Sequence, residues 1–159
     1  MNVTKVIGLE GFANSGKSST LRELIEDLVK NGWKIDRVFE NVYGHDAERK
    51  TIYKERDCIV VLKKDGQVIV VVLMGDYENV VNRIRELLGK LGVNVDLLFV
   101  AMRYPEVGEA YRGTFKSKLT VVFKPGYKRW DELPNQDGLV REWVERLKDV
   151  AGIDVAQKN

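Results

Sequence analysis

The sequence predicts an α/β fold in which a mostly parallel, three-layer sheet contains one antiparallel hairpin. Three observations lead to this prediction. A short apolar run, Lys5 to Glu10, is followed by a glycine-containing loop and then by apolar residues at helical spacing. Two β-branched runs flank Asp65-Gly66, a pair of residues that favours a hairpin turn. Val95 to Met102 is almost continuously apolar, as expected of a strand covered on both faces.

The first half of the chain predicts a strand, a helix, a second strand and the hairpin. The helix ends at Gly32, a C-terminal cap signal, and its apolar positions are Leu21, Leu24, Ile25, Leu28 and Val29. Trp33 to Val42 is the next expected strand, and the polar stretch Tyr43 to Arg56 separates it from the hairpin. The two hairpin strands are expected over Cys58 to Leu62 and Gln67 to Met74.

The second half predicts a helix, a central strand, a last strand and a closing helix. The first helix ends at Gly92 and carries the apolar stripe Val80, Val81, Ile84, Leu87, Leu88 and Leu91. Arg103 to Lys118 is polar and contains glycines, so we expect a loop there. Leu119 to Phe123 follows as a strand, and Lys124 to Gln136 as another loop. The closing helix is marked by Leu139, Val140, Trp143, Val144 and Leu147.

Composition indicates an ordinary globular chain. With 159 residues and no repeat or linker, we expect a single domain over residues 1–159. The net charge of +2 gives no global field that would demand nucleic acid as a partner. We expect a cytoplasmic protein without a membrane partner, because no run approaches the roughly 18 apolar residues that span a bilayer and because Cys58 has no second cysteine to pair with.

The chemistry is concentrated in residues 11–18, which read Gly-Phe-Ala-Asn-Ser-Gly-Lys-Ser and match the pattern Gly-x-x-x-x-Gly-Lys-Ser/Thr. The motif lies between an apolar strand and a helix, where its mechanism requires it. Glycines let the backbone wrap around an anion, and the helix N-terminus adds partial positive charge. The residues expected to hold the nucleotide are Gly11, Ala13, Asn14, Ser15, Gly16, Lys17, Ser18 and Ser19.

Two side chains of the motif have individual roles. Lys17 supplies a mobile charge for the β- and γ-phosphates, and the hydroxyl of Ser18 is a ligand for Mg²⁺, which prefers oxygen donors. The cofactors implied are therefore ATP and Mg²⁺. The alternative is a glycine turn that opens a helix and happens to contain Gly-Lys-Ser.

Asp76 is the expected acidic partner of the metal. It follows the apolar strand that ends at Met74, and Gly75 lets the chain turn sharply at the edge of the sheet. The alternative role for Asp76 is the N-cap of the helix expected to start near Tyr77, and one carboxylate can serve both purposes. Asp57 and Glu10 are the other acidic candidates.

Basic residues dominate the chain between positions 103 and 130. Arg103 directly follows the central strand, so it should emerge beside the phosphates and stabilise charge on a transferred phosphoryl group, and Arg112 is expected on the same loop. We include Lys17, Asp76, Arg103 and Arg112 as catalytic candidates. The alternative is a solvated basic face. Interleaved aromatic residues also permit contact with single-stranded nucleic acid, namely Tyr104, Tyr111, Phe115 and Tyr127.

The motif and its position resemble the P-loop NTPase superfamily, which implies a three-layer P-loop fold and NTP binding without choosing a reaction. Ras-like GTPases in this superfamily recognise guanine with Asn-Lys-x-Asp after a late strand. Here Leu119 to Phe123 leads instead into Lys124-Pro125-Gly126, and no Asp-x-x-Gly switch turn directly follows the hairpin. ATP is therefore favoured over GTP.

A second resemblance is to thymidylate kinases. Their loop is preceded by Glu-Gly, as in Glu10-Gly11, and their substrate segment is similar to Arg103-Tyr104 and Ala110-Tyr111-Arg112-Gly113. This implies a phosphorylated acceptor held by the arginines. The chain departs from that family at Ala13, where those enzymes carry an acid, and at Met102, where they carry an aspartate.

A third resemblance is to small P-loop proteins of bacteria and mobile elements that have a hairpin, a Gly-Asp after its second strand and Ala-x-Arg at the end of the next strand. Gly75-Asp76 and Ala101-Met102-Arg103 occur here in that order. The resemblance implies site roles for Asp76 and Arg103 and no particular substrate.

Three functions are compatible with these observations. The first is a Mg²⁺-dependent ATP-binding protein that hydrolyses ATP slowly or acts as a nucleotide-dependent switch. The second is a kinase for a small molecule or nucleotide, in which Arg103 and Arg112 hold the acceptor under a closing loop. The third is a non-catalytic module that presents an ATP-dependent surface to a protein or nucleic acid.

Overall fold

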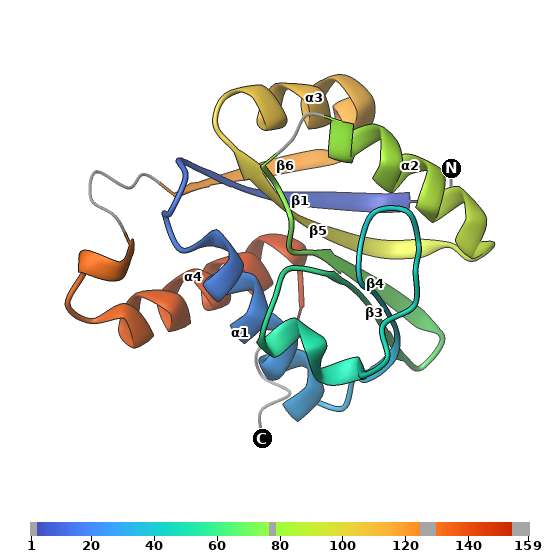
Figure 1. The fold of residues 1–159 in the computed structure, drawn as a ribbon, viewed down its shortest axis with the longest axis horizontal. Coiled ribbons are helices and arrows are strands. Elements are labelled where there is room, and N and C mark those ends of the chain that lie inside the picture. The colour runs from blue at the N-terminus through green and yellow to red at the C-terminus, as the bar shows by residue number, and fades with distance from the viewer. Residues whose placement is uncertain (1–2, 77–78, 125–129, 154–159) are drawn as a thin grey trace.

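The computed structural model describes residues 3–76, 79–124 and 130–153, which form an α/β structure around a six-stranded sheet (Figure 1). The strands are β1 (Val3–Gly11), β2 (Lys34–Phe39), β3 (Ile59–Lys64), β4 (Gln67–Val72), β5 (Val95–Arg103) and β6 (Leu119–Lys124). The α-helices are α1 (Lys17–Lys30), α2 (Asn79–Leu91), α3 (Glu106–Phe115) and α4 (Gln136–Ala151). Single 3₁₀ turns are η1 (Lys50–Lys54), η2 (Lys116–Lys118) and η3 (Trp130–Glu132).

The sheet is mixed and mostly parallel, with the strand order β2-β3-β4-β5-β1-β6. β1 pairs in parallel with β5 and β6, and β4 pairs in parallel with β5. β3 is antiparallel to both of its neighbours, β2 and β4, so it runs against the other strands. The predicted α/β class, with a mostly parallel sheet and an antiparallel pair, is confirmed.

The hairpin prediction is confirmed together with its turn. Lys64 and Gln67 face each other across Asp65 and Gly66, whose φ angles of 50° and 80° are both left-handed. A two-residue turn with two positive φ angles matches the right-handed twist of the strands, and Asp-Gly tolerates that geometry well. β3 begins one residue later than expected and ends two residues later, at Lys64 rather than Leu62, and β4 ends two residues earlier than expected, at Val72 rather than Met74.

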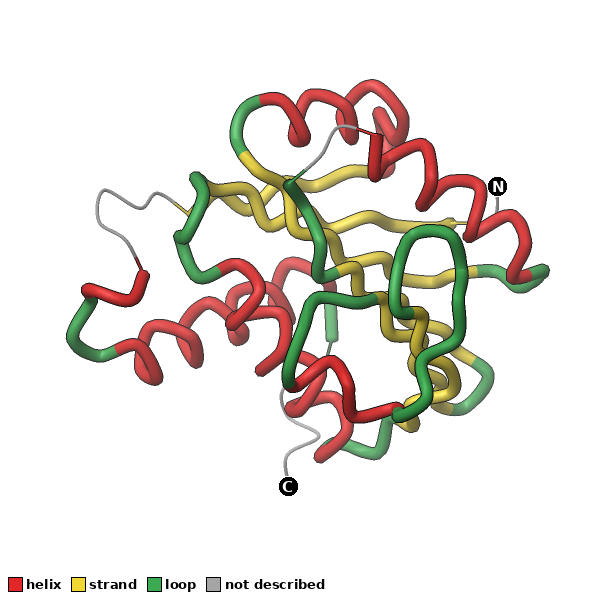
Figure 2. Tube along the Cα trace, in the orientation of Figure 1, coloured by secondary structure: helices red, strands yellow, loops and turns green. Residues whose placement is uncertain are grey.

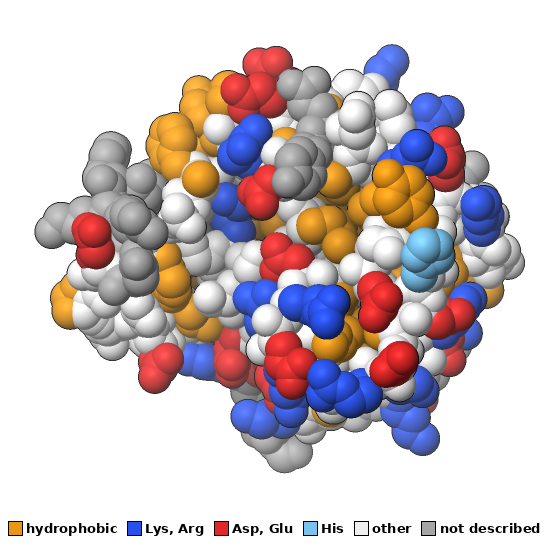
Figure 3. Space-filling model, viewed as in Figure 1, with side chains coloured by type: hydrophobic (Ala, Val, Ile, Leu, Met, Phe, Trp, Pro, Cys, Tyr) orange, Lys and Arg blue, Asp and Glu red, His pale blue; other side chains and the backbone are white. Residues whose placement is uncertain are grey.

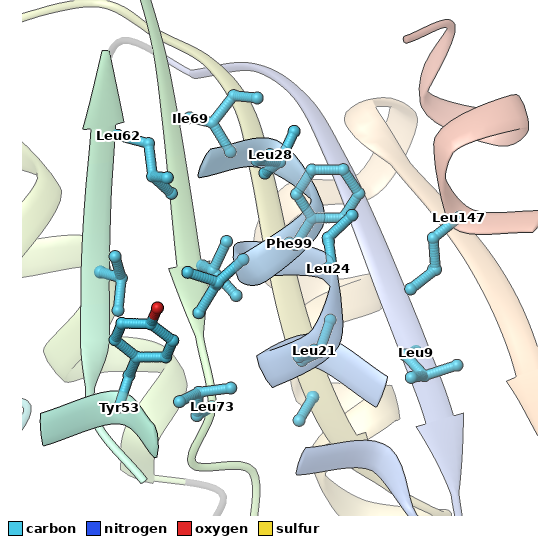
Figure 4. Packing of buried hydrophobic residues seen from close by; sticks show 14 of the residues in the cluster. Leu9, Leu21, Leu24, Leu28, Tyr53, Leu62, Ile69, Leu73, Phe99 and Leu147 are labelled. Atoms are coloured by element: carbon cyan, nitrogen blue, oxygen red, sulfur yellow. The ribbon is translucent and has the colours of Figure 1, made fainter. Parts of the chain in front are cut away.

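Helices pack against both faces of the sheet. One apolar cluster joins α1 and α4 to the sheet, and the other joins α2 and α3 to it. β1 contributes to both clusters because successive side chains point to opposite faces: Leu9 belongs to the first cluster and Val6 to the second. In Figure 4, Leu21 and Leu24 of α1 lie over the sheet near Phe99, and Leu147 reaches in from α4.

The prediction of a loop over Arg103 to Lys118 is wrong, because most of this segment is helix α3. Its large buried side chains, Val107, Tyr111 and Phe115, recur every four positions and form a single narrow line along the helix. Two glycines within the segment suggested a loop, and so sparse a stripe gave little helical signal against them. Packing of that line against the sheet outweighs the weak local preference.

The other segments expected to be irregular contain short turns. The polar stretch from Tyr43 to Arg56 includes η1, and the described part of the loop from Lys124 to Gln136 includes η3. Residues 125–129 of that loop lie outside the described residues.

None of the helices in the described ranges is long and apolar enough to cross a bilayer.

The strand directions bring several connections to one edge of the sheet. The parallel strands β1, β4 and β5 all end there, and β3 begins there because it runs in the opposite direction. Figure 2 shows the loops that follow β1, β4 and β5 in green at this end of the yellow strands. Ligand sites of open α/β sheets form at such an edge.

Candidate functional site

The segment from Gly11 to Ser18, here called the glycine loop, connects β1 directly to α1. Asn14 and Gly16 take left-handed conformations, with φ angles of 58° and 87°. Helix α1 then begins at Lys17, and both the amide and the hydroxyl of Thr20 donate to the Gly16 carbonyl, at 3.0 and 2.8 Å. The loop is thus a tight turn fastened to the first turn of the helix. The first amides of a helix have no partner within it, and such amides can donate to an anion.

Lys17 folds back over this loop. Its ammonium donates to the carbonyl oxygens of Gly11 and Phe12, at 3.0 and 2.7 Å, and to the Ser15 hydroxyl at 3.4 Å. Burial lowers the pKa of Lys17, and Arg103 lowers it further, whereas Asp76 and Asp57 act in the opposite direction. A buried ammonium among neutral acceptors is poorly compensated, so an anion in the loop would stabilise it.

A cavity of about 630 Å³ opens beside the glycine loop. It is lined by Ala13, Asn14, Ser15, Gly16, Lys17, Ser18, Ser19, Asp57, Leu73, Gly75, Asp76, Ala101, Arg103 and Trp130. The predicted nucleotide-binding residues from Ala13 to Ser19 all reach this cavity, as do Asp76 and Arg103. Gly11, the last residue of β1, is not among the lining residues, and its carbonyl accepts from Lys17 and from the Tyr104 amide.

Asp76 reaches the cavity because β4 and β5 approach closely at their ends. A β-carbon on Gly75 would lie 2.2 Å from the Ala101 carbonyl oxygen, so this contact requires glycine. The Gly75 carbonyl accepts from the Arg103 amide at 3.0 Å, which aligns the two strand ends. Asp76 is exposed, and it lies three residues after Leu73, whose carbonyl is 3.5 Å from the Ser18 hydroxyl.

Asp57 is a second carboxylate of the cavity, and sequence reasoning ranked it below Asp76. It precedes β3, and the antiparallel direction of β3 delivers it to the edge where the parallel strands end. The Arg22 guanidinium donates to Asp57 at 2.7 Å and to the Tyr53 carbonyl at 2.7 Å. The predicted hairpin already contained the signal, because its first strand must start where its second strand ends.

The structure separates the two arginines that the sequence placed together. Arg103 lines the cavity, but Arg112 lies on α3 and donates two hydrogen bonds to Glu10, at 3.1 and 2.7 Å. The Glu10 side chain is 2% exposed, and its hydrogen bonds and charge raise the pKa of Arg112. Glu10 and Arg112 therefore satisfy each other outside the cavity. Arg112 was expected on the same loop as Arg103, and it lies instead on helix α3, where it faces Glu10.

Trp130 was not recognised as a site residue from the sequence. Its amide donates to the Asn14 carbonyl at 2.7 Å, and its ring lies against Gly16, where a β-carbon would come within 2.5 Å of Cε3. The indole thus forms one wall of the cavity, directly on the glycine loop. A tryptophan in the loop before the closing helix was the available signal, and its target could not be read from local pattern.

A metal ion at this edge would need ligands beyond the protein. Over the described ranges, no group of three or more histidine, cysteine or acidic side chains is placed to hold a metal. Ser18, Asp57 and Asp76 nevertheless supply oxygen donors to one cavity. Mg²⁺ usually keeps several waters and phosphate oxygens in its shell, so this donor set fits a metal that arrives with a phosphate ligand.

Comparisons with known proteins identify no relative. No protein-family model matches the chain, and neither a curated protein nor a solved structure matches it. What the site binds has to follow from its own residues.

Proposed function

We propose that this chain is a P-loop NTPase-type protein with a three-layer fold, which binds Mg·ATP and either hydrolyses it slowly or uses it as a switch. The observation that carries the proposal is the position of Lys17. Its ammonium is buried within the glycine loop, among carbonyl oxygens, at the N-terminus of α1. A motif of this kind at this point of a strand-loop-helix unit is specific for phosphate.

Phosphate would improve the electrostatics of the loop in two ways. The first amides of α1 have no partner within the helix and can donate to phosphate oxygens. Lys17 can exchange the neutral Gly11 and Phe12 carbonyls for a phosphate whose full negative charge compensates the buried ammonium. Both effects favour a polyphosphate over a neutral ligand.

Mg²⁺ would enter with the phosphates. We assign Ser18 as its direct hydroxyl ligand and Asp76 as the carboxylate that holds it, either directly or through water. Asp57, fixed by Arg22, adds a second negative charge to the same cavity. Arg103 and Lys17 then face the oxygens on which charge develops when the terminal phosphoryl group leaves.

Hydrolysis in such a site is expected to be slow. Water attacks the terminal phosphorus, the bond to the bridging oxygen breaks, and ADP, inorganic phosphate and one proton are released. Asp57 and Asp76 are the acidic side chains that the described residues supply to this cavity, and both are engaged by Arg22 or assigned to the metal. Neither is left as a dedicated base, and this favours an occupancy switch or a slow ATPase.

Of the two arginines that the kinase alternative requires, Arg103 lines the cavity and Arg112 does not. Arg103 in the cavity could hold the phosphate of an acceptor. Arg112 would first have to leave the buried Glu10 carboxylate, which would then remain unpaired at a cost of about 3–5 kcal/mol. Transfer of labelled phosphate from ATP to a nucleoside, nucleotide or oligonucleotide end would favour this alternative over water as the acceptor.

The decisive experiment is thermal unfolding with each nucleoside triphosphate, with and without Mg²⁺. ATP at about a hundred times its dissociation constant should stabilise the wild-type protein by about 2.7 kcal/mol. Lys17→Ala should abolish this shift. Lys30→Ala, which removes an exposed lysine from the last turn of the same helix, should leave it unchanged. Absence of a shift with every nucleotide, or equal shifts in both variants, would contradict the proposal.

A further inference from the structure

A second cavity lies next to the one that holds the glycine loop. It measures about 310 Å³, and Ser19 and Trp130 line both cavities. Its other walls come from α1, from η1 and from the first residues of α4. In Figure 1, α4 runs beside α1 and its N-terminal end lies toward the edge where the parallel strands end. The second cavity, here called the side cleft, is thus reached from the phosphate position by passing the Trp130 indole.

Trp130 forms a fixed wall between the two cavities. Its backbone is held from two directions: the amide donates to Asn14, and the carbonyl accepts from the Gln136 side chain at 2.9 Å. Its ring rests on Gly16. A ring anchored in this way is already ordered before a ligand arrives, which lowers the entropic cost of packing against it.

The polar groups of the side cleft differ in how far they are already satisfied. Glu23 accepts from Arg141 at 3.2 Å, and Glu26 accepts from the Tyr53 hydroxyl at 2.6 Å. Asp137, on the first turn of α4, is exposed and accepts no hydrogen bond from the residues that the structure describes. Val140 adds an apolar surface one turn further along the helix. Among its lining residues, the side cleft therefore offers the Trp130 ring, the Val140 surface and the Asp137 carboxylate as groups that a ligand could contact.

We propose that the side cleft holds the nucleoside part of the triphosphate, with Trp130 packed against it and Asp137 accepting a hydrogen bond from it. This inference rests on the proposed function, because the glycine loop has to hold the phosphates. Ser19 lies at the junction, where the phosphate chain would give way to the sugar. The ligand class is a nucleoside with a hydrogen-bond donor, either an exocyclic amino group or a ribose hydroxyl.

The charges of the two cavities favour one orientation of the ligand, with the phosphates in the glycine loop and the nucleoside in the side cleft. A phosphate placed in the side cleft would face more carboxylates than cations, and its two cations, Arg22 and Lys54, are already paired with Asp57 and Glu26. A phosphate in the glycine loop instead faces Lys17 and the first amides of α1. A nucleoside carries no charge and can donate to Asp137. Packing against Trp130 tolerates any base, so Asp137 is the group that would discriminate among ligands.

The test compares ATP with inorganic tripolyphosphate, each with Mg²⁺, by calorimetric titration. The wild-type protein should bind ATP more tightly than tripolyphosphate. Trp130→Ala should weaken ATP on the order of tenfold more than it weakens tripolyphosphate, and the tripolyphosphate binding that remains shows that the variant is folded. Trp143→Ala is the matched control, because it removes a tryptophan of α4 that does not line the side cleft. Equal binding of the two ligands by wild type, or equal ATP loss in the two variants, would overturn the inference.

The two proposals fail differently. If tripolyphosphate binds and ATP binds no more tightly, the side cleft does not hold the nucleoside, and the proposed phosphate site is retained. If neither ligand binds, the proposed function fails, and the inference fails with it.

ATP analogues that lack one kind of hydrogen-bond donor identify the group that donates to Asp137. Relative to ATP, either 2′,3′-dideoxy-ATP or the triphosphate of purine riboside, which lacks the amino group, should bind the wild-type protein more weakly. In Asp137→Asn that difference should shrink, and in the control Asp149→Asn, an exposed acid near the other end of α4, it should remain. If both analogues bind wild type as tightly as ATP does, Asp137 has no such role.

Discussion

The Lys17 ammonium is held where its charge is disfavoured. Burial lowers its pKa, and the hydrogen bonds that it donates go to neutral oxygens of Gly11, Phe12 and Ser15. Because the folded-state pKa lies below the unfolded value, this group costs stability at neutral pH. The cost falls as pH rises from the folded pKa toward the unfolded pKa and is gone above the latter. A bound phosphate would offset that cost by supplying the counter-charge.

Gly16 allows the Trp130 ring to pack directly against the backbone of the glycine loop. Its φ angle is +87°, and a β-carbon would come within 2.5 Å of the indole. We expect Gly16→Ala to lose about 1–2 kcal/mol from the left-handed backbone and a further loss of about 1–3 kcal/mol from the displaced ring. Urea unfolding measures both effects together.

Gly92→Ala separates the two contributions at Gly16. Gly92 also has a positive φ, +68°, but nothing lies within 4 Å of the added carbon. This variant should show the backbone loss alone. Equal destabilisation of the two variants would mean that Trp130 moves aside freely, contrary to its role as a fixed wall.

Among the elements, α1 and α4 are joined by a polar contact inside an apolar interface. Asp27 of α1 and Lys148 of α4 are both buried, and their charged atoms lie 2.6 Å apart. Arg141 also approaches Asp27, at 3.4 Å. Buried pairs of this kind contribute little when intact and cost much when one partner is removed. The contact fixes how α4 sits against α1, and with it the walls of the side cleft.

Asp27→Asn should therefore destabilise the protein by about 3–5 kcal/mol at pH 7, because Lys148 would stay buried without a counter-charge. Burial by itself would raise the pKa of Asp27, but Lys148 and Arg141 lower it below 3.8. The stabilising charge is present above that value and is lost as pH falls through the folded-state pKa. Wild type and variant should accordingly converge in unfolding free energy as the pH is lowered below 3.8.

The control for Asp27→Asn is the same substitution in an exposed pair. Asp36 lies 3.3 Å from Lys63 with both side chains more than 40% exposed, and pairs of that kind are worth about 0–1 kcal/mol. Urea unfolding of both variants between pH 3 and 7 makes the comparison. A loss in Asp27→Asn no larger than that in Asp36→Asn would show that the helix contact is dispensable.

At the scale of the whole molecule, the cavity is assembled from segments far apart in the chain. The glycine loop, Asp57, Asp76, Arg103 and Trp130 come from different connections, and the sheet order brings them to one edge. Basic and acidic side chains are interspersed over the face drawn in Figure 3, in keeping with the net charge of +2. Local groups in the cavity, rather than an overall field, must therefore select the ligand.

The direction of β3 leads to a prediction about the metal. If Asp57 supports Mg²⁺ from this edge, Asp57→Asn should raise the Mg²⁺ concentration needed for half of the ATP-induced stabilisation on the order of tenfold, the size of effect that outer-sphere partners have. Asp65→Asn changes an aspartate at the opposite end of the same strand and should have no effect. Identical Mg²⁺ dependence in wild type and Asp57→Asn would remove Asp57 from the metal site.

The sequence by itself determined the features that are encoded locally. The Asp65-Gly66 turn and the strand-loop-helix unit around Lys17 each depend on neighbouring residues and their conformational preferences, so both could be predicted with their positions. The apolar run of β5 likewise predicted a strand between two others, and β5 does lie between β4 and β1. Helix α3 was missed because its stripe is sparse and its stability comes from the sheet beneath it.

The tertiary structure alone decided which side chains meet. Asp57 enters the cavity through the direction of β3, Trp130 through its contact with Gly16, and Arg112 is turned away toward Glu10 by α3. Each of these placements depends on contacts between residues distant in the chain. Local propensity carries no information about such contacts, because strand order and helix packing are settled by burial over the whole molecule.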